Sequence, residues 1–302
     1  MSLNIDPALL PALAAFERVA RHQSFSRAAE EMGVSASALS QTVRSLEGRL
    51  GMRLLARTTR RVACTEEGAA LLRGVREGLG TLADALDSLD AHRGRPRGMV
   101  RVTVPRMAYF QHFLPRLASF HARYPEVELE FSLDDHLIDL VGEGFDAGVR
   151  IGEQIDRDMI ALPIGGPLRL VTVGAPAYFR RHPVPQVPEA LADHECTRYR
   201  YATSGRISPW MFARDGERIE VAVGGRLILN DLVAEIAVAH AGLALVQTVE
   251  SAVQDDIAQG ALVPVLEPYT LSMGRMYLYF PSREQLPLRV RCFIDHFRAE
   301  PD

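Results

Sequence analysis

The chain has 302 residues, of which 47% are hydrophobic and 24% are charged, and its formal net charge is −4. This length allows roughly two domains, and the acidic balance means that any surface for nucleic acid must be local. The three cysteines form no CxxC pair, so neither a disulfide framework nor a zinc site is indicated. No apolar run reaches the length of a membrane span, and no signal-peptide pattern opens the chain. We therefore expect a cytoplasmic protein with no membrane partner.

The first 50 residues predict three short helices. Residues 7–22 carry an apolar stripe at helical spacing, Ser26 opens a second helix that ends before Gly33, and Ser35 is an N-cap for a third. In the third helix an apolar stripe should pack inward at Leu39, Val43, Leu46 and Leu50. The side chains that then face outward together are Ser37, Ser40, Gln41 and Arg44. This order is typical of a helix–turn–helix whose second helix fits a major groove, although an isolated polar face is more often only solvated.

The stretch LLARTTRRVACTEEG, at residues 54–68, predicts a short β-hairpin with Arg57, Arg60 and Arg61 near its tip. Between residues 40 and 62, six arginines stand against one acid, which gives a local net charge of +5. A charge run is usually just solvated. Here it flanks a candidate reading helix, as a wing that enters a minor groove would.

These motifs lie in the stretch FERVARHQSFSRAAEEMGVSASALSQTVRSLEGRLGMRLLARTTRRVACTEEG. In this order they resemble the winged helix–turn–helix of LysR-type transcriptional regulators. The resemblance implies that Arg60 enters the minor groove and that three residues face the major groove, Ser37, Ser40 and Gln41. Gly48 and Cys64 depart from the family pattern, and we expect both to lie off the reading face. The predicted DNA-binding residues are Ser26, Ser35, Ser37, Ser40, Gln41, Arg44, Arg57, Thr58 and Arg60.

The segment 66–92 indicates a dimer. Its apolar residues alternate at spacings of three and four, which makes a heptad seam of Leu72, Val75, Leu79, Leu82, Leu86 and Leu89. A single amphipathic helix usually packs on a core, but the Gly/Pro/Arg stretch at 93–98 follows at once and is typical of a linker. This favours pairing with a second copy, and the resemblance implies a helix that dimerises the DNA-binding domains. We predict a winged helix–turn–helix at 1–65, a dimerising linker helix at 66–92 and a hinge at 93–98, and leave open whether dimers pair into tetramers.

From Met99 onward, strand and helix patterns alternate, which predicts parallel sheets flanked by helices. The predicted elements include a helix at 136–144 and strands at 100–104, 127–133 and 147–152. The length fits an effector-binding domain at 99–302 with two α/β subdomains, I at about 99–165 plus 270–302 and II at about 166–269. The resemblance implies the late return to subdomain I, a likeness to periplasmic binding proteins and a ligand cleft between the subdomains. The fold class is therefore α/β with an N-terminal α winged helix–turn–helix.

Four stretches should border this cleft, because each follows a strand or opens a helix, where free N–H groups and the helix dipole favour an anion. They supply the predicted effector-binding residues Pro105, Arg106, Arg150, Thr203, Ser204, Asn230 and Asp231. Since arginine can hold a carboxylate with two parallel bonds, we predict a small-molecule effector that carries a carboxylate. The alternative is that Arg150 pairs with an acid such as Asp146 to brace the sheet, and that Arg106 points into solvent.

An enzymatic function has no motif to carry it. The sequence contains no GxSxG, HExxH or GxxxxGK[ST] pattern and no ligand spacing among its histidines, so we predict no catalytic residue, metal or cofactor. An alternative is an architectural DNA-binding protein without a ligand, but this would assign no function to about 200 α/β residues. The sequence thus predicts a sequence-specific LysR-type regulator controlled by a small molecule bound between the subdomains. Its partners would be double-stranded promoter or operator DNA, a second copy of the chain and, if it activates transcription, RNA polymerase.

Overall fold

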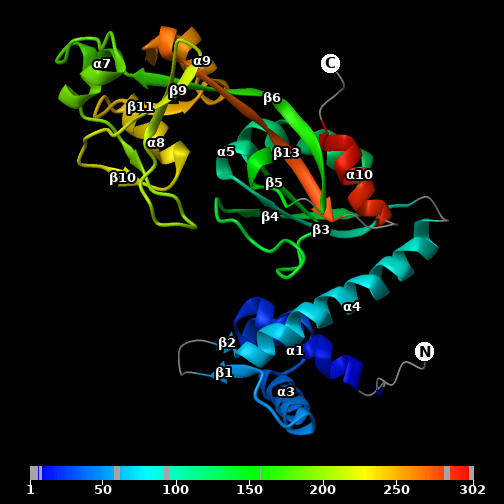
Figure 1. Cartoon of the computed structure of the whole chain (residues 1–302). Coiled ribbons are helices and arrows are strands. Elements are labelled where there is room, and N and C mark those ends of the chain that lie inside the picture. The colour runs from blue at the N-terminus through cyan, green and yellow to red at the C-terminus, as the bar shows by residue number, and fades with distance from the viewer. Residues whose placement is uncertain are drawn as a thin grey trace. The chain divides into compact units, whose positions relative to one another are not determined.

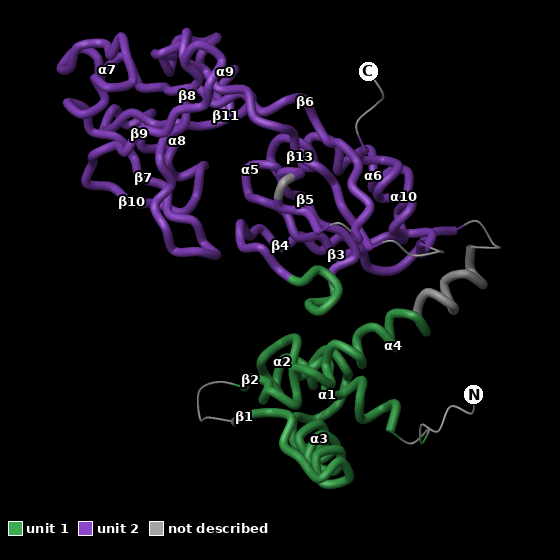
Figure 2. The backbone as a smooth tube through the Cα atoms, viewed as in Figure 1, with its two compact units in different colours: residues 1–94, 139–144 green, residues 95–138, 145–302 purple. Residues whose placement is uncertain are grey.

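The computed structural model describes residues 6, 9–57, 62–91, 95–156, 158–281 and 286–298 (Figure 1). They fall into two compact units, unit 1 with residues 1–94 and 139–144 and unit 2 with residues 95–138 and 145–302 (Figure 2). No helix within the described ranges combines the length and the apolar composition that crossing a membrane requires.

Unit 1 begins with three helices around one core, α1 (Leu10–His22), α2 (Phe25–Glu31) and α3 (Ala36–Leu50). The inward stripe predicted for α3 is confirmed, since Leu39, Val43 and Leu46 are at most 2% exposed. They pack against buried residues of α1 and α2, namely Phe16, Val19, Ala28 and Ala29. Burial of these side chains holds the three helices together, because apolar surface removed from water is the main favourable term in folding.

The turn between α2 and α3 has the conformation that the sequence predicts. Gly33 has a φ of 64°, which L side chains rarely adopt. Ser35 has extended backbone angles and is the N-cap of α3, because its Oγ accepts the Ala38 N–H at 3.1 Å. These two residues set where α3 begins.

The second helix starts earlier than predicted. It begins at Phe25, and its N-cap is Ser24, whose Oγ accepts the Arg27 N–H at 3.4 Å. Ser24 has the extended backbone that an N-cap needs, with φ −157° and ψ 124°, and Phe25 then packs on the core. The expectation that Ser26 opens this helix is therefore wrong, and Ser26 lies exposed in the first turn.

The predicted hairpin is confirmed. Strands β1 (Leu55–Arg57) and β2 (Val62–Cys64) pair antiparallel over three residues each. Thr58 and Arg60, both predicted to contact DNA, lie outside the described residues, as does the side chain of Arg57.

Helix α4 (Glu66–Ala91) carries the predicted heptad seam. Its first two positions, Leu72 and Val75, are 9% and 8% exposed, so they are already packed. Leu79 is half-buried, whereas Leu82 is 52% exposed. The side chains of Leu86 and Leu89 lie outside the described residues. Packing within one chain thus uses the start of the seam and leaves Leu82 uncovered.

Unit 2 is built on one mixed sheet in the order β11–β6–β13–β5–β3–β4, with β12 paired to β6. In chain order these strands are β3 (Gly98–Val104), β4 (Val127–Leu133), β5 (Ala147–Ile151), β6 (Met159–Gly174), β11 (Val246–Val249), β12 (Val263–Val265) and β13 (Leu271–Pro281). β3 is parallel to β4 and β5, whereas β13 is antiparallel to both β5 and β6. The predicted parallel pairing is therefore right for β3, β4 and β5 and wrong for the rest of the sheet, because residues 276–279 return against residues 148–151.

Two long strands connect the two halves of unit 2. β6 has 16 residues and β13 has 11, and they lie side by side from one half to the other (Figure 1). The first half contains β3, β4, β5, α5 (Arg106–Ala108), α6 (Leu117–Arg123) and α10 (Leu288–Phe297), with buried rings at Phe113, Phe120, Phe293 and Phe297. The second half contains β11 and β12 with α7 (Pro176–Phe179), β7 (Arg198–Tyr199), β8 (Trp210–Arg214), β9 (Glu217–Val221), β10 (Ile228–Leu229), α8 (Leu232–His240) and α9 (Gln254–Ala258).

The helix predicted at 136–144 is wrong, since this segment forms turns and no helix. Two aspartate side chains bind backbone N–H groups that a helix would have used. Asp134 Oδ1 accepts from the His136 N–H at 2.9 Å, and Asp139 Oδ1 accepts from the Gly142 N–H at 2.9 Å. Such local bonds offer the backbone an alternative to a helix, and here they make a loop after β4 that reaches the second half of unit 2.

Candidate DNA-reading surface and effector pocket

One side of α3 carries the predicted reading face. Ser37, Gln41 and Arg44 are exposed, whereas Ser40 is half-buried at the edge of this face. The Arg44 Nε donates to the Ser40 carbonyl at 3.3 Å, which holds the start of the guanidinium group against the helix. The Ser35 hydroxyl caps the helix and lies 3.0 Å from the Ser37 hydroxyl, so it is occupied within the chain. Ser37, Gln41 and Arg44 thus form the part of the face that is open to a partner.

Gly48 lies on the same side of α3, against expectation. It is exposed, and no atom comes within 4 Å of the position that its Cβ would take. It follows Gln41 by seven residues, which is close to two full helical turns of about 3.6 residues each. The expectation that Gly48 lies off the reading face is therefore wrong, because this spacing returns to the same side of a helix.

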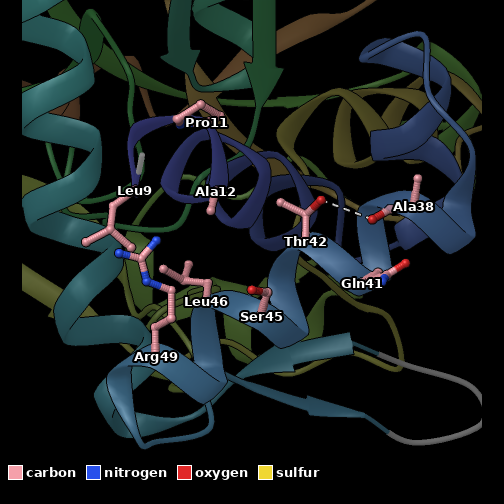
Figure 3. Close-up of a pocket in the computed structure, with 9 residues that line it drawn as sticks. All are labelled: Leu9, Pro11, Ala12, Ala38, Gln41, Thr42, Ser45, Leu46 and Arg49. Atoms are coloured by element: carbon pink, nitrogen blue, oxygen red, sulfur yellow. Dashed lines mark hydrogen bonds between the residues drawn. The ribbon is translucent and has the colours of Figure 1, made fainter. Parts of the chain in front are cut away.

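A groove of about 430 Å³ runs beside the reading face, between α3 and the start of α1 (Figure 3). Figure 3 shows Gln41 and Arg49 at opposite ends of it, with Arg49 beside Leu9. The Thr42 Oγ1 donates to the Ala38 carbonyl at 3.0 Å, so this hydroxyl is used within the helix. Arg49 forms an ion pair with Asp6. Two of the four polar residues that line this groove, Thr42 and Arg49, are thus engaged within unit 1.

Charged groups tie the end of α1 to the end of α2. Glu31 accepts from Arg21 at 2.6 Å, lies 3.1 Å from the Arg18 Nε and contacts the His22 ring. Burial raises the pKa of Glu31, but the bond with His22 and the charges of Arg21 and Arg18 outweigh it and hold the pKa below its usual value. This network fixes α2 against α1 and so helps to place α3.

In unit 2, three polar contacts join the two halves near the predicted effector residues. The Arg106 Nε donates to Asp231 Oδ2 at 2.6 Å. The two other contacts come from the loop after β4, where the Tyr199 hydroxyl donates to Asp135 Oδ2 at 2.6 Å and the Leu137 N–H donates to Thr203 Oγ1 at 2.9 Å. Residues after β3 and β4 therefore meet the last residue of β7 and residues that follow β7 and β10, as an effector cleft would require.

The carboxylate of Asp231 makes two interactions. Its Oδ1 accepts the Ala234 N–H at 2.9 Å and caps α8, while its Oδ2 holds Arg106. Since an aspartate already occupies this helix start, an added anion would meet a negative charge there. Arg106 is 45% exposed and Asp231 30%, and exposed pairs of this kind contribute about 0–1 kcal/mol. The contact between Arg106 and Asp231 is therefore a weak one.

Arg150 lies beneath the loop after β4 and is 2% exposed. Its Nη1 and Nη2 donate to the carbonyls of Val149, Asp134 and His136, at 2.6, 3.1 and 2.5 Å, and to Thr103 Oγ1 at 3.2 Å. Burial lowers the pKa of Arg150 below its usual value. Arg150 thus braces the sheet and the loop through backbone carbonyls, whereas Asp146 accepts from the Arg101 N–H at 2.8 Å instead.

A pocket of about 250 Å³ lies beside these contacts and is lined from both halves. His136 comes from the first half, and Arg200, Tyr201, Gly205 and Asn230 are among the lining residues of the second. Among the predicted effector residues, Asn230 lines this pocket. Thr203 and Ser204 lie in the loop before Gly205, and Pro105 precedes α5.

Sequence reasoning missed four residues that the structure places at this junction, Asp135, His136, Tyr199 and Arg200. The signal was available for the first two, because residues 134–136 follow a strand just as Pro105 and Arg106 do. The mistaken helix at 136–144 hid it. No group of three or more metal-binding side chains occurs in the part of the chain that the structure describes.

A buried carboxyl group lies near the start of α8. Glu235 is 2% exposed, and burial raises its pKa to about 7, an effect that the Thr197 hydroxyl reduces and the charge of Asp231 increases. Burial and the bond to Asp135 also raise the pKa of the Tyr199 hydroxyl. The side of the junction formed by α8 and β7 therefore holds a carboxyl group that changes charge near neutral pH.

Two family models together match most of the chain. A bacterial regulatory helix-turn-helix protein of the lysR family matches residues 10–69, and a LysR substrate binding domain matches residues 93–302. The chain belongs to the LysR family of transcriptional regulators. It is therefore a DNA-binding regulator with a domain for a small-molecule effector, and not an enzyme.

Relatives and a solved structure of a LysR-type regulator match this chain over 95% of its length. A putative transcriptional regulator of Pseudomonas aeruginosa is 41% identical over 286 residues, which cover 95% of this chain and 94% of the relative. The HTH-type transcriptional regulator PgrR of Escherichia coli is 38% identical and covers 95% of this chain and 96% of its own. The structure of CrgA, a LysR-type regulator from Neisseria meningitidis, matches with a TM-score of 0.61 and 29% identity over 95% of this chain and 97% of that one.

Proposed function

We propose that α3 enters the major groove of a double-stranded operator and reads it through the exposed face of Ser37, Gln41 and Arg44. The observation that carries this proposal is the polar face itself, which lies on the side of α3 away from its buried apolar stripe. Gln41 can offer a donor and an acceptor to an adenine, and Arg44 can reach a phosphate or a guanine. The short side chain of Ser37 lets the helix approach the base edges closely.

The hairpin β1–β2 would act as the wing, with Arg57, Thr58 and Arg60 directed to the minor groove and its phosphates. The hairpin is present, and the local charge of +5 around it is what a surface for a polyanion needs in a chain of net charge −4. Ser26 lies exposed in the first turn of α2, where it could contact the DNA backbone.

The test compares variants on a cognate operator and on unrelated duplexes over a range of salt. Arg60→Ala should weaken binding to all sequences and lower the salt slope by about one. Gln41→Ala should relax the preference at one base pair and weaken cognate binding by ~1–3 kcal/mol. Arg49→Ala is the control for net charge, because it removes an arginine that lines the groove between α3 and the start of α1 and is not among the proposed DNA-binding residues. If the Arg60 and Gln41 variants both bound the operator like the parent, the docking would be wrong.

We also propose that the chain forms a homodimer through α4. The heptad spacing continues beyond the part of the seam that packs within unit 1, and Leu82 is 52% exposed there. A two-fold interface would cover it with the same surface of a second copy.

We propose further that the effector is a small molecule that occupies the pocket beside His136 and Asn230 and carries a carboxylate for Arg106. Arg106 already binds a carboxylate, that of Asp231, and its two terminal nitrogens have no partner among the described residues. The side-chain amide of Asn230 is likewise without a partner there. A volume of about 250 Å³ is just below the roughly 300–1,000 Å³ usual for ligand pockets, so the effector should be small. Arg150 would act indirectly, by holding the loop that contains His136.

A further inference from the structure

The carboxylate of Glu47 joins the reading helix to the start of the wing. Glu47 lies near the end of α3, and its Oε1 accepts the backbone N–H groups of both Leu54 and Leu55, at 2.9 and 3.1 Å. Leu54 and Leu55 are 0% and 2% exposed, so their N–H groups have no ready access to water. Unmet buried N–H groups are costly, and here one side chain of α3 satisfies two of them in succession.

The same short segment is held from the other side by the start of α4. The Thr65 N–H donates to the Leu54 carbonyl at 3.0 Å, and the Thr65 Oγ1 donates to the Arg53 carbonyl at 2.8 Å. The Gly68 N–H donates to the Thr65 Oγ1 at 3.0 Å, so Thr65 also caps α4. A Cβ on Gly68 would lie 2.0 Å from the Leu54 carbonyl oxygen, which shows how closely the two segments approach. The base of the wing is thus clamped between α3 and α4.

These contacts of Glu47 and Thr65 with residues 53–55 matter because the hairpin is short. β1 and β2 pair over three residues each, and a two-stranded hairpin of this kind has little stability of its own. The three residues of β1 span about 10 Å, so a tilt of about 10° at the base moves the end of this strand by roughly 2 Å. Such a displacement is enough to break a hydrogen bond to a phosphate or a base.

We propose that Glu47 is a positioning residue for DNA recognition, which fixes the wing relative to the reading helix so that both contact the duplex in one register. This inference rests on the winged docking proposed above. Glu47 acts through an acceptor atom at the right distance and not through its negative charge, which by itself would repel DNA.

Two conservative variants distinguish the effect of the position of the Glu47 acceptor oxygen from the effect of its negative charge. Glu47→Gln keeps an acceptor oxygen at the same place and loses the charge, since an amide carbonyl can accept two bonds. Glu47→Asp keeps the charge and withdraws the carboxylate by roughly 1.5 Å, one carbon–carbon bond. Glu47→Ala removes both, and Glu67→Ala is the control, because it removes an exposed acid from the first turn of α4.

The experiment uses the full chain and a duplex selected by the parent protein from random sequences. Hydroxyl-radical cleavage reports the minor-groove contact of the wing, and methylation of guanine reports the major-groove contact of α3 in the same complex. We expect Glu47→Gln and Glu67→Ala to protect both grooves like the parent. Glu47→Asp should keep the α3 protection, lose at least half of the wing protection and bind about tenfold more weakly, the effect of one lost contact.

The outcomes are distinct. Wing protection that is retained in Glu47→Asp, or lost in Glu47→Gln while it persists in the parent, overturns the role of Glu47 and leaves the docking intact. Absence of wing protection in the parent overturns the docking and the role together. Equal loss of both protections in Glu47→Asp would show that the residue only supports the fold, which also overturns the proposal. Because Glu47→Ala could fail to fold, the Gln and Asp pair decides the result.

Discussion

Replacing Glu235 with glutamine should change how the stability of unit 2 depends on pH. In the folded protein, burial raises the pKa of this carboxyl group from a usual value of 4.5 to about 7. The folded state then binds a proton more tightly than the unfolded state, so this group favours folding at low pH. Its contribution is complete below about pH 4.5 and is lost as the pH rises through about 7.

The difference between 4.5 and about 7, at 1.36 kcal/mol for each pH unit, amounts to about 3 kcal/mol. The parent should lose this much from Glu235 between about pH 4.5 and pH 8. Glu235→Gln cannot ionise, so it should lose none of it. We therefore expect the variant to become more stable relative to the parent as the pH rises, whatever constant offset the amide introduces.

Trp210 provides the assay. It is the single tryptophan of the chain, it is 4% exposed, and its Nε1 donates to the Thr197 carbonyl at 3.2 Å, in the same half of unit 2 as Glu235. Urea unfolding followed by its fluorescence, at several pH values between about 5 and 8, gives the free energy of unfolding of this half. Glu217→Gln is the matched control, since it removes an exposed carboxyl on β9. A free-energy difference between Glu235→Gln and the parent that stays constant over this pH range would refute the reasoning.

Three further changes have clear expected outcomes. Gly48→Ala should raise the free energy of unfolding of unit 1 by up to ~1 kcal/mol in denaturant melts, because its Cβ would meet open space in a helix, and a destabilised variant would contradict this. Replacing both Leu79 and Leu82 with Glu should abolish the dimer in sedimentation, because it buries like charges in a two-fold interface, whereas an unchanged dimer would assign the seam to packing within one chain. Arg106→Ala should weaken calorimetric binding of an effector identified by native mass spectrometry. An undiminished affinity, or a neutral or cationic effector, would exclude the carboxylate proposal.

The reading helix could be predicted because its information is local. A period of 3.6 residues assigns each side chain of α3 to the core or to the surface without knowledge of any other element. The same period places Gly48 on the exposed side, seven residues after Gln41. The wing base could not be predicted, since the bonds from Glu47 to Leu54 and Leu55 depend on how the chain turns after Gly51.

The sheet of unit 2 shows a different limit. Alternating strands and helices favour parallel pairing, and β3, β4 and β5 follow that rule. β13 pairs with β6 although about 100 residues separate them in sequence, and nothing local in either strand encodes the direction of that pairing. The register shifts between Ser272 and Met276 also depend on the partner strand, so they are visible only in the folded chain.

The sequence left two roles open for Arg150, contact with the effector or bracing of the sheet, and its burial decides which groups it contacts in the structure. Its place at the end of β5 predicted a side chain that faces the effector, but a buried guanidinium needs partners at once. The Asp134 and His136 carbonyls provide them, and these belong to the loop whose other groups reach Tyr199 and line the pocket. Arg150 binds this loop through its backbone carbonyls, so the side chains of the loop can make other contacts. We therefore expect Arg150 to influence effector binding through the position of His136, and Arg106 to influence it through direct contact.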